Sequence, residues 1–513
     1  MSKAGGTELG TRSLVWFRTD LRTHDHAALA HACAAQRERG VTPGGVVGLF
    51  VLSPGEWRAH DWACVKVEFV LRTLRELSAA LAKLNIPLLI RSAKGPGDVP
   101  AVVAKAAREV GAARVDFNRE YEVNERRRDE AVTRELEKLG VRVFAWHDQC
   151  VLEPGCVRTG AGGPFTVFTP FRRAWLRVSA ERGGVKDLGT PEVQKKIDLA
   201  PDEVPGRVPG FGSDIAPERW PAGESEALRR LRVFVAERGR AYKDRRDFPA
   251  VDGTSTLSPY LAIGAVSPRV CVRAAAEANA GALDGGSAGL AGWITELVWR
   301  EFYIHVVDAF PRVCMHRAFK PAAERVAWRT DEAQLLAWQE GRTGFPIVDA
   351  AMRQLRALGW MHNRLRMISA MFLTKDLLID WRLGERFFMQ NLVDGFLPSN
   401  NGGWQWSAST GTDAQPYFRI FNPFSQSERF DPDGSFIRAW VPELRGVRGA
   451  AVHQPYDPKK GLAPLERAKL EYPPPIVDHS KARERVLKAF KIAAGIAEGA
   501  EAAGGEAQDS DED

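Results

Sequence analysis

The order of apolar and polar positions divides the chain into two unlike parts. Up to about residue 147, short runs of apolar and β-branched residues alternate with segments of helical periodicity. The clearest helix is predicted at 63–84, where apolar residues recur every three to four positions. The runs that predict strands are 13–18, 45–52, 86–91, 113–118 and 141–146. Near-continuously apolar strands separated by helices predict a doubly wound parallel sheet.

The pattern changes after the last of these strands. Residues 151–222 are rich in glycine, proline and charge and show little periodicity, which indicates a long linker. From about Ala227 onward strand signals nearly vanish, so we expect an all-α second domain. The predicted divisions are an α/β domain at 11–150, a linker at 151–222, a helical domain at 223–495 and a disordered acidic tail at 496–513.

Composition narrows the class of protein. No apolar run approaches the roughly 18 residues that cross a bilayer, and the first residues lack the apolar core of a signal peptide, so we expect no membrane association. The six cysteines form no CxxC pair and no zinc-ligand spacing. They indicate a reducing, intracellular compartment and no bound metal.

Charge is distributed unevenly along the chain. The net charge is +6, and residues 498–513 contain seven acidic and no basic residues, so the chain before them carries +13. A basic body of this size fits a polyanionic partner, with nucleic acid as the first candidate. An arginine-rich composition without such a partner is the alternative.

The stretch 391–423 has the most unusual mixture of side chains. Asn400 to Gly403 bring amides and almost no apolar volume, and Trp404 and Trp406 follow in alternation. Neither a packed core nor a simple surface loop has a use for this mixture. Glycines let a backbone approach a flat ligand, amides bond its edge and indoles stack on it. We therefore expect a cavity for a large aromatic cofactor or an unstacked base.

A second segment, 253–267, places hydroxyl groups before an apolar helical run. Thr254, Ser255 and Ser258 precede that run. Hydroxyls and free backbone N–H groups at a helix start suit a diphosphate. Plain N-capping of the helix is the alternative.

Two further helical stretches carry polar and aromatic residues on one face. In the first, at 293–306, the shared face is formed by Glu296, Trp299, Arg300 and Tyr303. In the second, at 359–381, it is formed by Trp360, Asn363, Arg364 and Met367. Such faces suit the wall of a polar aromatic ligand, although a solvated face is the alternative for the first. Arg364 and Arg366 point to different sides, so one could meet a phosphate while the other pairs internally, or both could form structural ion pairs.

Together these residues resemble the photolyase/cryptochrome family, and most closely its class I cyclobutane pyrimidine dimer photolyases. The resemblance covers almost the whole chain. Its motifs are VWFRTDLRTHDH (15–26), FTPFRRAW (168–175), RRDFPAVDGTSTLSPYLAIG (245–264), TELVWREFY (295–303), EGRTGFPIVDAAMRQL (340–355) and GWMHNRLRMISAMFLTKDLLIDWRLGERFF (359–388). The resemblance implies an α/β domain, a long linker and a helical domain that holds FAD, in agreement with the periodicity.

The resemblance also implies the cofactor site. The residues that would hold FAD are Tyr242, Thr254, Ser255, Thr256, Leu257, Ser258, Arg366 and Asp394. Asn400 would face flavin N5, where an amide can serve either protonation state of an anionic, fully reduced flavin. Trp381, Trp404 and Trp328 would form the chain that reduces FAD under light.

The implied substrate is UV-damaged DNA that contains pyrimidine dimers. Glu296 would meet the flipped-out dimer, and Trp299 and Trp406 would flank it. The full set that would contact lesion or strand is Arg246, Glu296, Trp299, Arg300, Asn363, Arg364, Met367, Trp406, Arg419 and Gln426. Excited reduced FAD would donate an electron, the cyclobutane ring would split, and the electron would return.

Two departures from the family pattern affect these expectations. Phe396 stands where the family often has a second aspartate near the flavin. The positions that hold a methenyltetrahydrofolate antenna in some members are matched by His60, Asn124, Glu125 and Cys314. Met315 stands beside them where the family pattern has a lysine. Folate remains the favoured antenna, and a deazaflavin or no antenna are the alternatives.

Two other functions compete on the same scaffold. A cryptochrome would sense blue light without repair, and Asn400, Glu296 and the short acidic tail argue against it. A photolyase for (6-4) photoproducts would have histidines where this chain has Asn363 and Met367. We expect a monomer in the cytoplasm, at the nucleoid, of a bacterium, or in the nucleus of a eukaryote.

Overall fold

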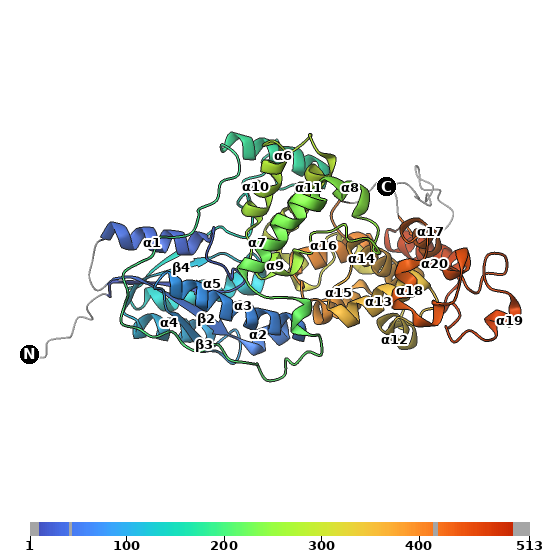
Figure 1. Cartoon of the computed structure of the whole chain (residues 1–513), viewed down its shortest axis with the longest axis horizontal. Helices are drawn as coiled ribbons and strands as arrows, with labels where there is room; N and C mark the ends of the chain where they lie inside the picture. The colour runs from blue at the N-terminus through green and yellow to red at the C-terminus, as the bar shows by residue number, and fades with distance from the viewer. Residues whose placement is uncertain (1–9, 40–43, 414–418, 496–513) are drawn as a thin grey trace, which may run out of the picture.

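A computed structural model describes residues 10–39, 44–413 and 419–495 of the chain. An α/β part lies at one end of an elongated molecule, and the C-terminal helices lie at the other (Figure 1). The predicted acidic tail, 496–513, lies outside the described residues.

The α/β part is built on one parallel sheet. Its five strands follow the order β3-β2-β1-β4-β5. All pairings are parallel. The strands are β1 (Arg12–Phe17), β2 (Val46–Leu52), β3 (Leu88–Ser92), β4 (Ala112–Asn118) and β5 (Arg142–Trp146). Each predicted strand is therefore confirmed, and so is the doubly wound topology.

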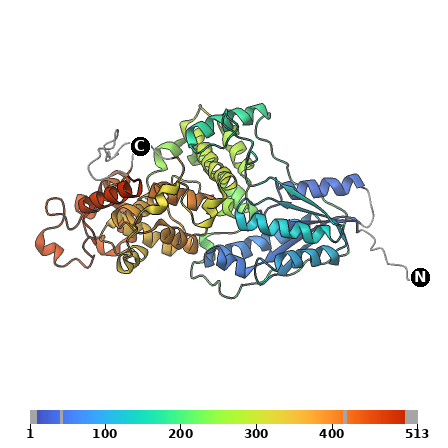
Figure 2. The ribbon, with the colours of Figure 1, turned by 180° about the vertical axis from the view of Figure 1, so that it is seen from behind.

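Helices cover both faces of this sheet (Figures 1 and 2). Val15 and Phe17 of β1 share a core with α1 (Ala27–Arg39) and α3 (Cys64–Lys83). The alternate residues, Leu14 and Trp16, share another with α4 (Val99–Glu109) and α5 (Val123–Glu137). Burial on both faces explains why the strands are apolar throughout. The short α2 (Pro54–Ala59) follows β2.

The predicted linker contains one regular element. Helix α6 (Phe168–Glu181) interrupts it and packs against α11 of the helical part. Its apolar side chains, among them Phe171 and Trp175, are buried. The burial of this one helix comes from a partner more than a hundred residues away along the chain.

The helical part follows the predicted periodicity. Its α-helices are α7 (Glu224–Val233), α8 (Tyr242–Arg245), α9 (Ser258–Ala262), α10 (Pro268–Ala278), α11 (Ala288–Ala309), α12 (Glu332–Glu340), α13 (Pro346–Leu358), α14 (Asn363–Met371), α15 (Trp381–Asn391), α16 (Leu397–Ala408), α17 (Pro423–Phe430), α18 (Ser435–Trp440), α19 (Pro464–Arg467) and α20 (His479–Ala493). Shorter turns are the π-helical η2 (Phe234–Arg238) and η6 (Phe372–Asp376), and the 3₁₀ turns η1 (Pro217–Arg219), η3 (Gly239–Ala241), η4 (Pro311–Met315), η5 (Pro321–Arg325), η7 (Pro442–Leu444) and η8 (Gly449–Val452). Among the described residues of this part, β pairing is limited to a bridge between Arg329 and Ile379.

Local sequence explains where several of these helices begin and end. The Asp331 side chain accepts from the Gln334 N–H and caps α12, which ends where Gly341 adopts a φ of +67°. Helix α13 has Pro346 in its first turn and ends at Gly359, with a φ of +63°. These boundaries place Trp360 and the start of α14 next to the hydroxyl segment before α9.

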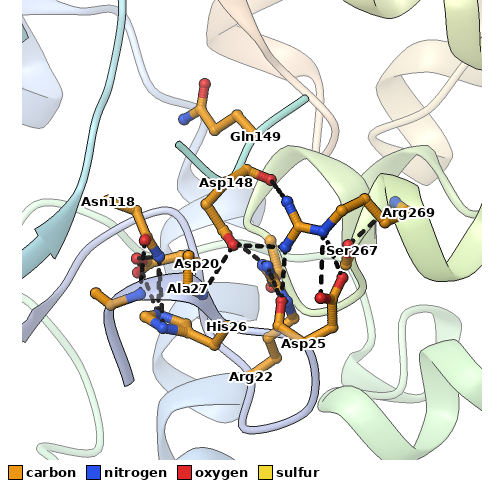
Figure 3. Close-up of polar contacts among 12 residues, drawn as sticks. Asp20, Arg22, Asp25, His26, Ala27, Asn118, Asp148, Gln149, Ser267 and Arg269 are labelled. Carbon is orange, nitrogen blue, oxygen red and sulfur yellow. Dashed lines mark hydrogen bonds and ion pairs between the residues drawn. The ribbon is translucent and has the colours of Figure 1, made fainter. Parts of the chain in front are cut away.

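A buried ion network joins the α/β part to α10 (Figure 3). We define it as Arg22, Asp25, Asp148 and Arg269. Arg269 Nε donates to Asp25 Oδ2 at 2.9 Å and its Nη2 donates to Asp148 Oδ1 at 2.8 Å. Arg22 pairs with the other Asp148 oxygen. Arg22 and Asp25 follow β1, and Asp148 follows β5. The network therefore closes part of the carboxyl edge of the sheet, where doubly wound proteins commonly bind ligands.

Candidate active site and interdomain cleft

A charged cluster lies beside the middle of α11. The Glu296 carboxylate pairs with the guanidinium of Arg246, directly after α8. Asp247 pairs with Arg364 Nη2 at 3.0 Å. Burial raises the pKa of Glu296, although the Arg246 charge opposes that rise. A carboxyl group of raised pKa can hold a proton toward a bound ligand, while the arginines provide charge for phosphate.

An aromatic wall adjoins this cluster. Trp299 stacks on Phe168 of α6, with ring centroids 3.5 Å apart and planes 9° apart. Tyr303 lies one turn further along α11, 5.7 Å from the Trp299 ring. A β-carbon at Gly402 would lie 2.2 Å from the Tyr303 ring, whereas one at Gly403 would meet no described atom within 4 Å. Gly402 thus makes room for the Tyr303 side chain, whereas Gly403, the other glycine of the pair, faces open space.

Arg300 does not join this wall, contrary to the expectation from the helix face. Its Nη1 donates to the Gln149 carbonyl at 2.6 Å and its Nη2 to the Leu261 carbonyl at 3.3 Å. Its guanidinium also lies 4.7 Å from the centre of the Phe396 ring. Consecutive helix residues point about 100° apart, so Arg300 faces the α/β part while Trp299 faces α6. The predicted lesion contact of Arg300 has no support in this geometry.

The start of α14 contributes a second polar edge. Asn363 is exposed, Met367 is partly buried, and Asn363 Nδ2 lies 4.0 Å from Met367 Sδ. The Trp360 indole N–H donates to Ser258 Oγ at 3.2 Å. This bond connects the edge to the hydroxyl segment.

The remaining predicted DNA contacts differ in exposure. Arg419 and Trp406 are partly exposed. Gln426 is 3% exposed, and its Oε1 has no hydrogen-bond partner among the described residues. The expected contact of Gln426 with a DNA strand therefore has no support in this conformation.

The segment Asp394–Phe396, which we call the flavin loop, lies between α15 and α16. Arg366 Nη2 donates to Asp394 Oδ2 at 2.7 Å, as the resemblance implied. Arg364 pairs with Asp247, so both arginines of α14 have carboxylate partners. The observed arrangement is therefore the alternative in which both arginines form structural ion pairs. The other Asp394 oxygen is buried without a hydrogen-bond partner among the residues described.

The side chains of the hydroxyl segment 254–258 do not cap α9. Within the described part of the chain, no side chain caps α9. Thr256 has a φ of +50°, and its hydroxyl accepts from Arg230 Nη1 at 2.9 Å. Ser258 is exposed and Leu257 is buried. The hydroxyls and the nearby guanidinium therefore suit a diphosphate better than the capping alternative does. Tyr242 lies buried against Phe234, with ring centroids 5.8 Å apart.

The two asparagines of α16 have different tasks. Asn400 Nδ2 donates to the Glu385 carbonyl oxygen at 3.0 Å. Asn401 Nδ2 donates to the Glu385 carboxylate at 2.8 Å and is itself buried. Asn401 is thus a structural residue, whereas the Asn400 amide keeps its oxygen and a second N–H available for a ligand within the described contacts.

The three tryptophans of the predicted electron chain lie on segments that contact one another. Trp404 packs on the backbone of α15, since a β-carbon at Gly384 would lie 2.1 Å from its ring. Trp381 begins that helix. Arg329, the neighbour of Trp328, donates its N–H to the Leu378 carbonyl, three residues before Trp381. Trp404 and Trp381 are buried and Trp328 is partly exposed, an order that leads from the interior to the surface.

Unsatisfied groups in this region point to a bound molecule. Asp394 Oδ1 and the Trp404 indole N–H are buried and lack partners within the described ranges. Native interiors rarely leave such groups unpaired. With Asn400, Arg366 and the hydroxyl segment, they fit a large ligand that has both hydrogen-bonding edges and a diphosphate, as FAD does.

A cleft lies between the α/β part and the helical part. It brings together all the residues predicted for an antenna, His60, Asn124, Glu125 and Cys314. His60 Nε2 lies 3.1 Å from Asn124 Nδ2, and His60 Nδ1 lies 3.1 Å from Glu125 Oε1. The buried indole N–H of Trp16, also in the lining, has no partner among the described residues.

The cleft also holds a carboxylate cluster. Side-chain atoms of Glu56, His60 and Glu125 lie within 4.8 Å of one another. Arg128 already pairs with Glu56 at 2.8 Å, which uses part of the ligand capacity that a metal would need. Burial, helped by Glu125 and Glu120, raises the pKa of nearby Glu122 to about 8.

Sequence reasoning missed two residues of this region. Phe168 lies in a motif that we quoted only for its resemblance. Lys66 lies on the apolar side of α3, is 3% exposed and donates to the Gly395 carbonyl of the flavin loop at 2.6 Å. A lysine among the buried residues Val67, Phe69 and Val70 is the signal that could have revealed it.

Comparison with known proteins agrees with this geometry. Residues 13–192 match the family model described as DNA photolyase, and residues 293–492 match the FAD binding domain of DNA photolyase. The deoxyribodipyrimidine photo-lyase of Escherichia coli is 46% identical over 486 residues, which cover 94% of this chain and 99% of that protein. The chain belongs to the DNA photolyase family. The corresponding enzyme of Neurospora crassa is 43% identical to this chain. The alignment covers 93% of this chain and 81% of that protein.

Solved structures of the family share the fold. The class III photolyase of Agrobacterium tumefaciens has a TM-score of 0.79 at 35% identity, covering 96% of this chain and all of that one. A Synechocystis cryptochrome has a TM-score of 0.81 at 26% identity, covering 94% of this chain and all of that one. The predicted family, fold, activity of light-dependent pyrimidine-dimer repair and FAD-binding domain are thus confirmed. Over the described residues, none of the helices has the length and apolar character needed to cross a membrane.

Proposed function

We propose that the protein splits cyclobutane pyrimidine dimers in DNA by using FAD bound between α11, α14 and α16. Bound reduced FAD supplies the light-excited electron and recovers it after the ring opens. The observation that carries the proposal is that α11, with Glu296 and Trp299, packs on α16, with Asn400 and Trp404. Residues suited to the lesion and residues suited to the flavin therefore lie on neighbouring helices.

The cofactor is held at three places. The hydroxyl segment 254–258 and Arg230 bind the diphosphate, and Tyr242 packs beside them. Asp394, oriented by Arg366, accepts a hydrogen bond through its unpaired oxygen. Asn400 turns its amide toward flavin N5, where it can donate or accept.

The lesion is held by the charged cluster and the aromatic wall. Glu296 faces a pyrimidine carbonyl, and the burial that raises its pKa favours a protonated, hydrogen-bond-donating carboxyl once Arg246 turns to DNA. Trp299 and Trp406 replace the stacking that the flipped-out bases lose, and Asn363 and Met367 complete the pocket. Arg246, Arg364 and Arg419 contact phosphates, which requires the first two to exchange part of their carboxylate pairing for DNA.

The decisive experiment measures repair. Purified protein with reduced FAD should split the dimer of an oligonucleotide containing one thymine dimer under blue or near-UV light and leave the dimer intact in the dark. Glu296→Gln should lower repair per absorbed photon by about tenfold with little change in DNA affinity, since the glutamine amide can donate a hydrogen bond but cannot transfer a proton. Repair in the dark, or no repair by FAD-loaded protein, contradicts the proposal. Light-driven FAD reduction without repair would favour a cryptochrome.

We infer that Trp404, Trp381 and Trp328 carry electrons to the flavin from the surface. Trp404→Phe should abolish the photoreduction of oxidised FAD, because phenylalanine is much harder to oxidise than tryptophan. Repair by pre-reduced Trp404→Phe enzyme should persist. The matched control is Trp338→Phe, a buried tryptophan 6.0 Å from Trp404 but outside the proposed chain. Equal photoreduction in wild type and Trp404→Phe contradicts the assignment.

We also infer that the interdomain cleft holds a light-harvesting chromophore. His60, Asn124, Glu125 and Cys314 favour methenyltetrahydrofolate, and the replacement of a lysine by Met315 leaves a deazaflavin as the alternative. A Sulfolobus tokodaii photolyase, 28% identical with a TM-score of 0.75, was solved with two FAD molecules. The absorption spectrum of chromophores released from purified protein separates these possibilities.

The assembly and location follow as smaller proposals. We propose that the protein is a monomer, which analytical sedimentation would test. We also propose that its domains end at residues 150, 222 and 495. The compartment would be the one that holds the host's DNA.

A further inference from the structure

Lys66 connects the α/β part to the flavin loop. It lies on α3 and is 3% exposed. Its ammonium donates to the Gly395 carbonyl at 2.6 Å, across the boundary between the two parts of the molecule. Gly395 follows Asp394, whose carboxylate pairs with Arg366. One side chain of the α/β part thus bonds the backbone beside the proposed flavin ligand.

The surroundings of Lys66 do not resemble a simple ion pair. Its Nζ lies 3.7 Å from the centre of the Trp62 ring. Four carboxylates act on it from a distance, Glu122, Glu120, Asp394 and Glu125. They come from the segment before α5, from α5 itself and from the flavin loop, and none of them pairs directly with Lys66 among the described contacts. Over the described ranges, the Gly395 carbonyl is therefore the one close polar partner of the ammonium.

The position is a costly one for a charge. Burial lowers the pKa of Lys66 to about 8, although the four carboxylates oppose this. The neighbouring residues of α3, such as Phe69 and Val70, are buried and apolar. A methionine would fill the same space without desolvating a charge, so packing of α3 does not explain a lysine here.

The flavin loop is held from its other side as well. Arg300 of α11 lies over the Phe396 ring at 4.7 Å and donates to the Gln149 carbonyl beside the cleft. The loop therefore lies between a lysine of the α/β part and an arginine of the helical part. Its conformation decides where the unpaired Asp394 oxygen points.

We propose that Lys66 is a positioning residue for the flavin, which holds the Gly395 carbonyl so that Asp394 points into the FAD site. The inference rests on the proposed placement of FAD at Asp394. It assigns to the α/β part a direct share in cofactor binding, in addition to the cleft.

The test uses holoenzyme and four proteins. Lys66→Met removes the ammonium but keeps the length of the side chain, and Lys66→Arg keeps the charge and the donors. Lys83→Met is the matched control, because Lys83 is exposed at the far end of the same helix. The fourth protein is the wild type. The first readout is the rate of FAD release on dilution, followed by the fluorescence of free flavin. The second is the thermal midpoint of the holoenzyme.

Lys66→Met should release FAD at least about tenfold faster than wild type, the effect of one charged hydrogen bond. Lys66→Arg should stay within about threefold of wild type, since it retains a donor cation. Lys83→Met should match wild type. Release from wild type should accelerate as pH rises through about 8, where Lys66 loses its proton, and release from Lys66→Met should not.

The thermal midpoint separates positioning from structure. Lys66→Met should melt within about 3 °C of wild type. Wild-type release by Lys66→Met overturns the inference. The inference is also overturned if Lys66→Met releases FAD faster but has a lower thermal midpoint, and Lys66→Arg does not restore either property. Wild type that binds no FAD overturns the proposed function as well, whereas FAD-loaded, repairing wild type with an unchanged Lys66→Met overturns this inference alone.

Discussion

Two polar regions lie at the carboxyl edge of the same sheet and differ in how their charges are matched. The ion network of Figure 3 follows β1 and β5 and joins the sheet to α10. The interdomain cleft lies beyond β1, β2 and β4. Both regions are buried in a place where doubly wound proteins bind ligands, yet only the cleft is open.

In the ion network each charge has a partner at contact distance. Burial alone would raise the pKa of Asp148, but Arg22 and Arg269 outweigh it and hold that pKa well below its ordinary range. Burial likewise opposes the charge of Arg269, and Asp148 and Asp25 raise its pKa above the ordinary value. Such a cluster has no capacity left for a ligand.

In the cleft the charges are only partly matched: Arg128 pairs with Glu56 and Glu120, whereas Glu122 and Lys66 have no ion-pair partner among the described residues. Burial raises the pKa of Glu122 to about 8 and lowers that of Lys66 to about 8. The unpaired N–H of Trp16 adds an unsatisfied donor. The comparison teaches that paired charges close one half of this edge as structure, while mismatched groups keep the other half ready for a bound molecule.

The largest expected effect comes from breaking the ion network. Arg269→Met leaves Asp25 and part of Asp148 buried without a cation, so we expect a loss of roughly 3–5 kcal/mol in the free energy of unfolding. Urea unfolding followed by tryptophan fluorescence measures it. Arg177→Met serves as control, because Arg177 forms an exposed pair with Glu181 at 3.8 Å. That control should change stability by less than about 1 kcal/mol. Similar losses in both variants would remove the distinction between matched and exposed pairs.

A smaller effect should follow from removing a mismatched charge in the cleft. The folded pKa of Glu122, about 8, exceeds its unfolded value, so its contribution to stability is present in acid and disappears as pH rises through about 8. Because the side chain is partly exposed, we expect this contribution to be only roughly 1–2 kcal/mol. Glu122→Gln should therefore flatten the fall in stability between pH 5 and 9, measured as the thermal midpoint in matched buffers. An unchanged pH profile would place the titration elsewhere.

The smallest effect on stability is expected at His60. His60→Ala should change the free energy of unfolding by less than about 1 kcal/mol, since its contacts with Asn124 and Glu125 are partly exposed to solvent. Its loss should reduce the second chromophore by about tenfold in affinity while FAD content stays constant. The ratio of the two chromophores in the absorption spectrum of purified protein measures this. Equal loss of both chromophores would show that the cleft and the flavin site are not separate.

Local sequence predicted the framework well. Near-continuous apolar runs placed the strands and period-3.6 patterns placed most helices, because the sheet is buried on both faces and each helix on one. The Arg366–Asp394 pair and the cluster of His60, Asn124 and Glu125 also agreed with expectation. Arg300 did not, since a shared helix face does not specify which neighbour each side chain meets. Phe168 and Lys66 were missed because their roles depend on contacts with α11 and with the flavin loop.

By itself, the sequence determined the sheet, the helical second part, the family and the set of polar and aromatic residues that suit a flavin and a lesion. Only the tertiary structure decided which arginines are already paired, which of two glycines makes room for Tyr303, and that Lys66 bonds the flavin loop. The physical reason is that periodicity records burial along one element, whereas the pairing of charges depends on atoms brought together from distant segments.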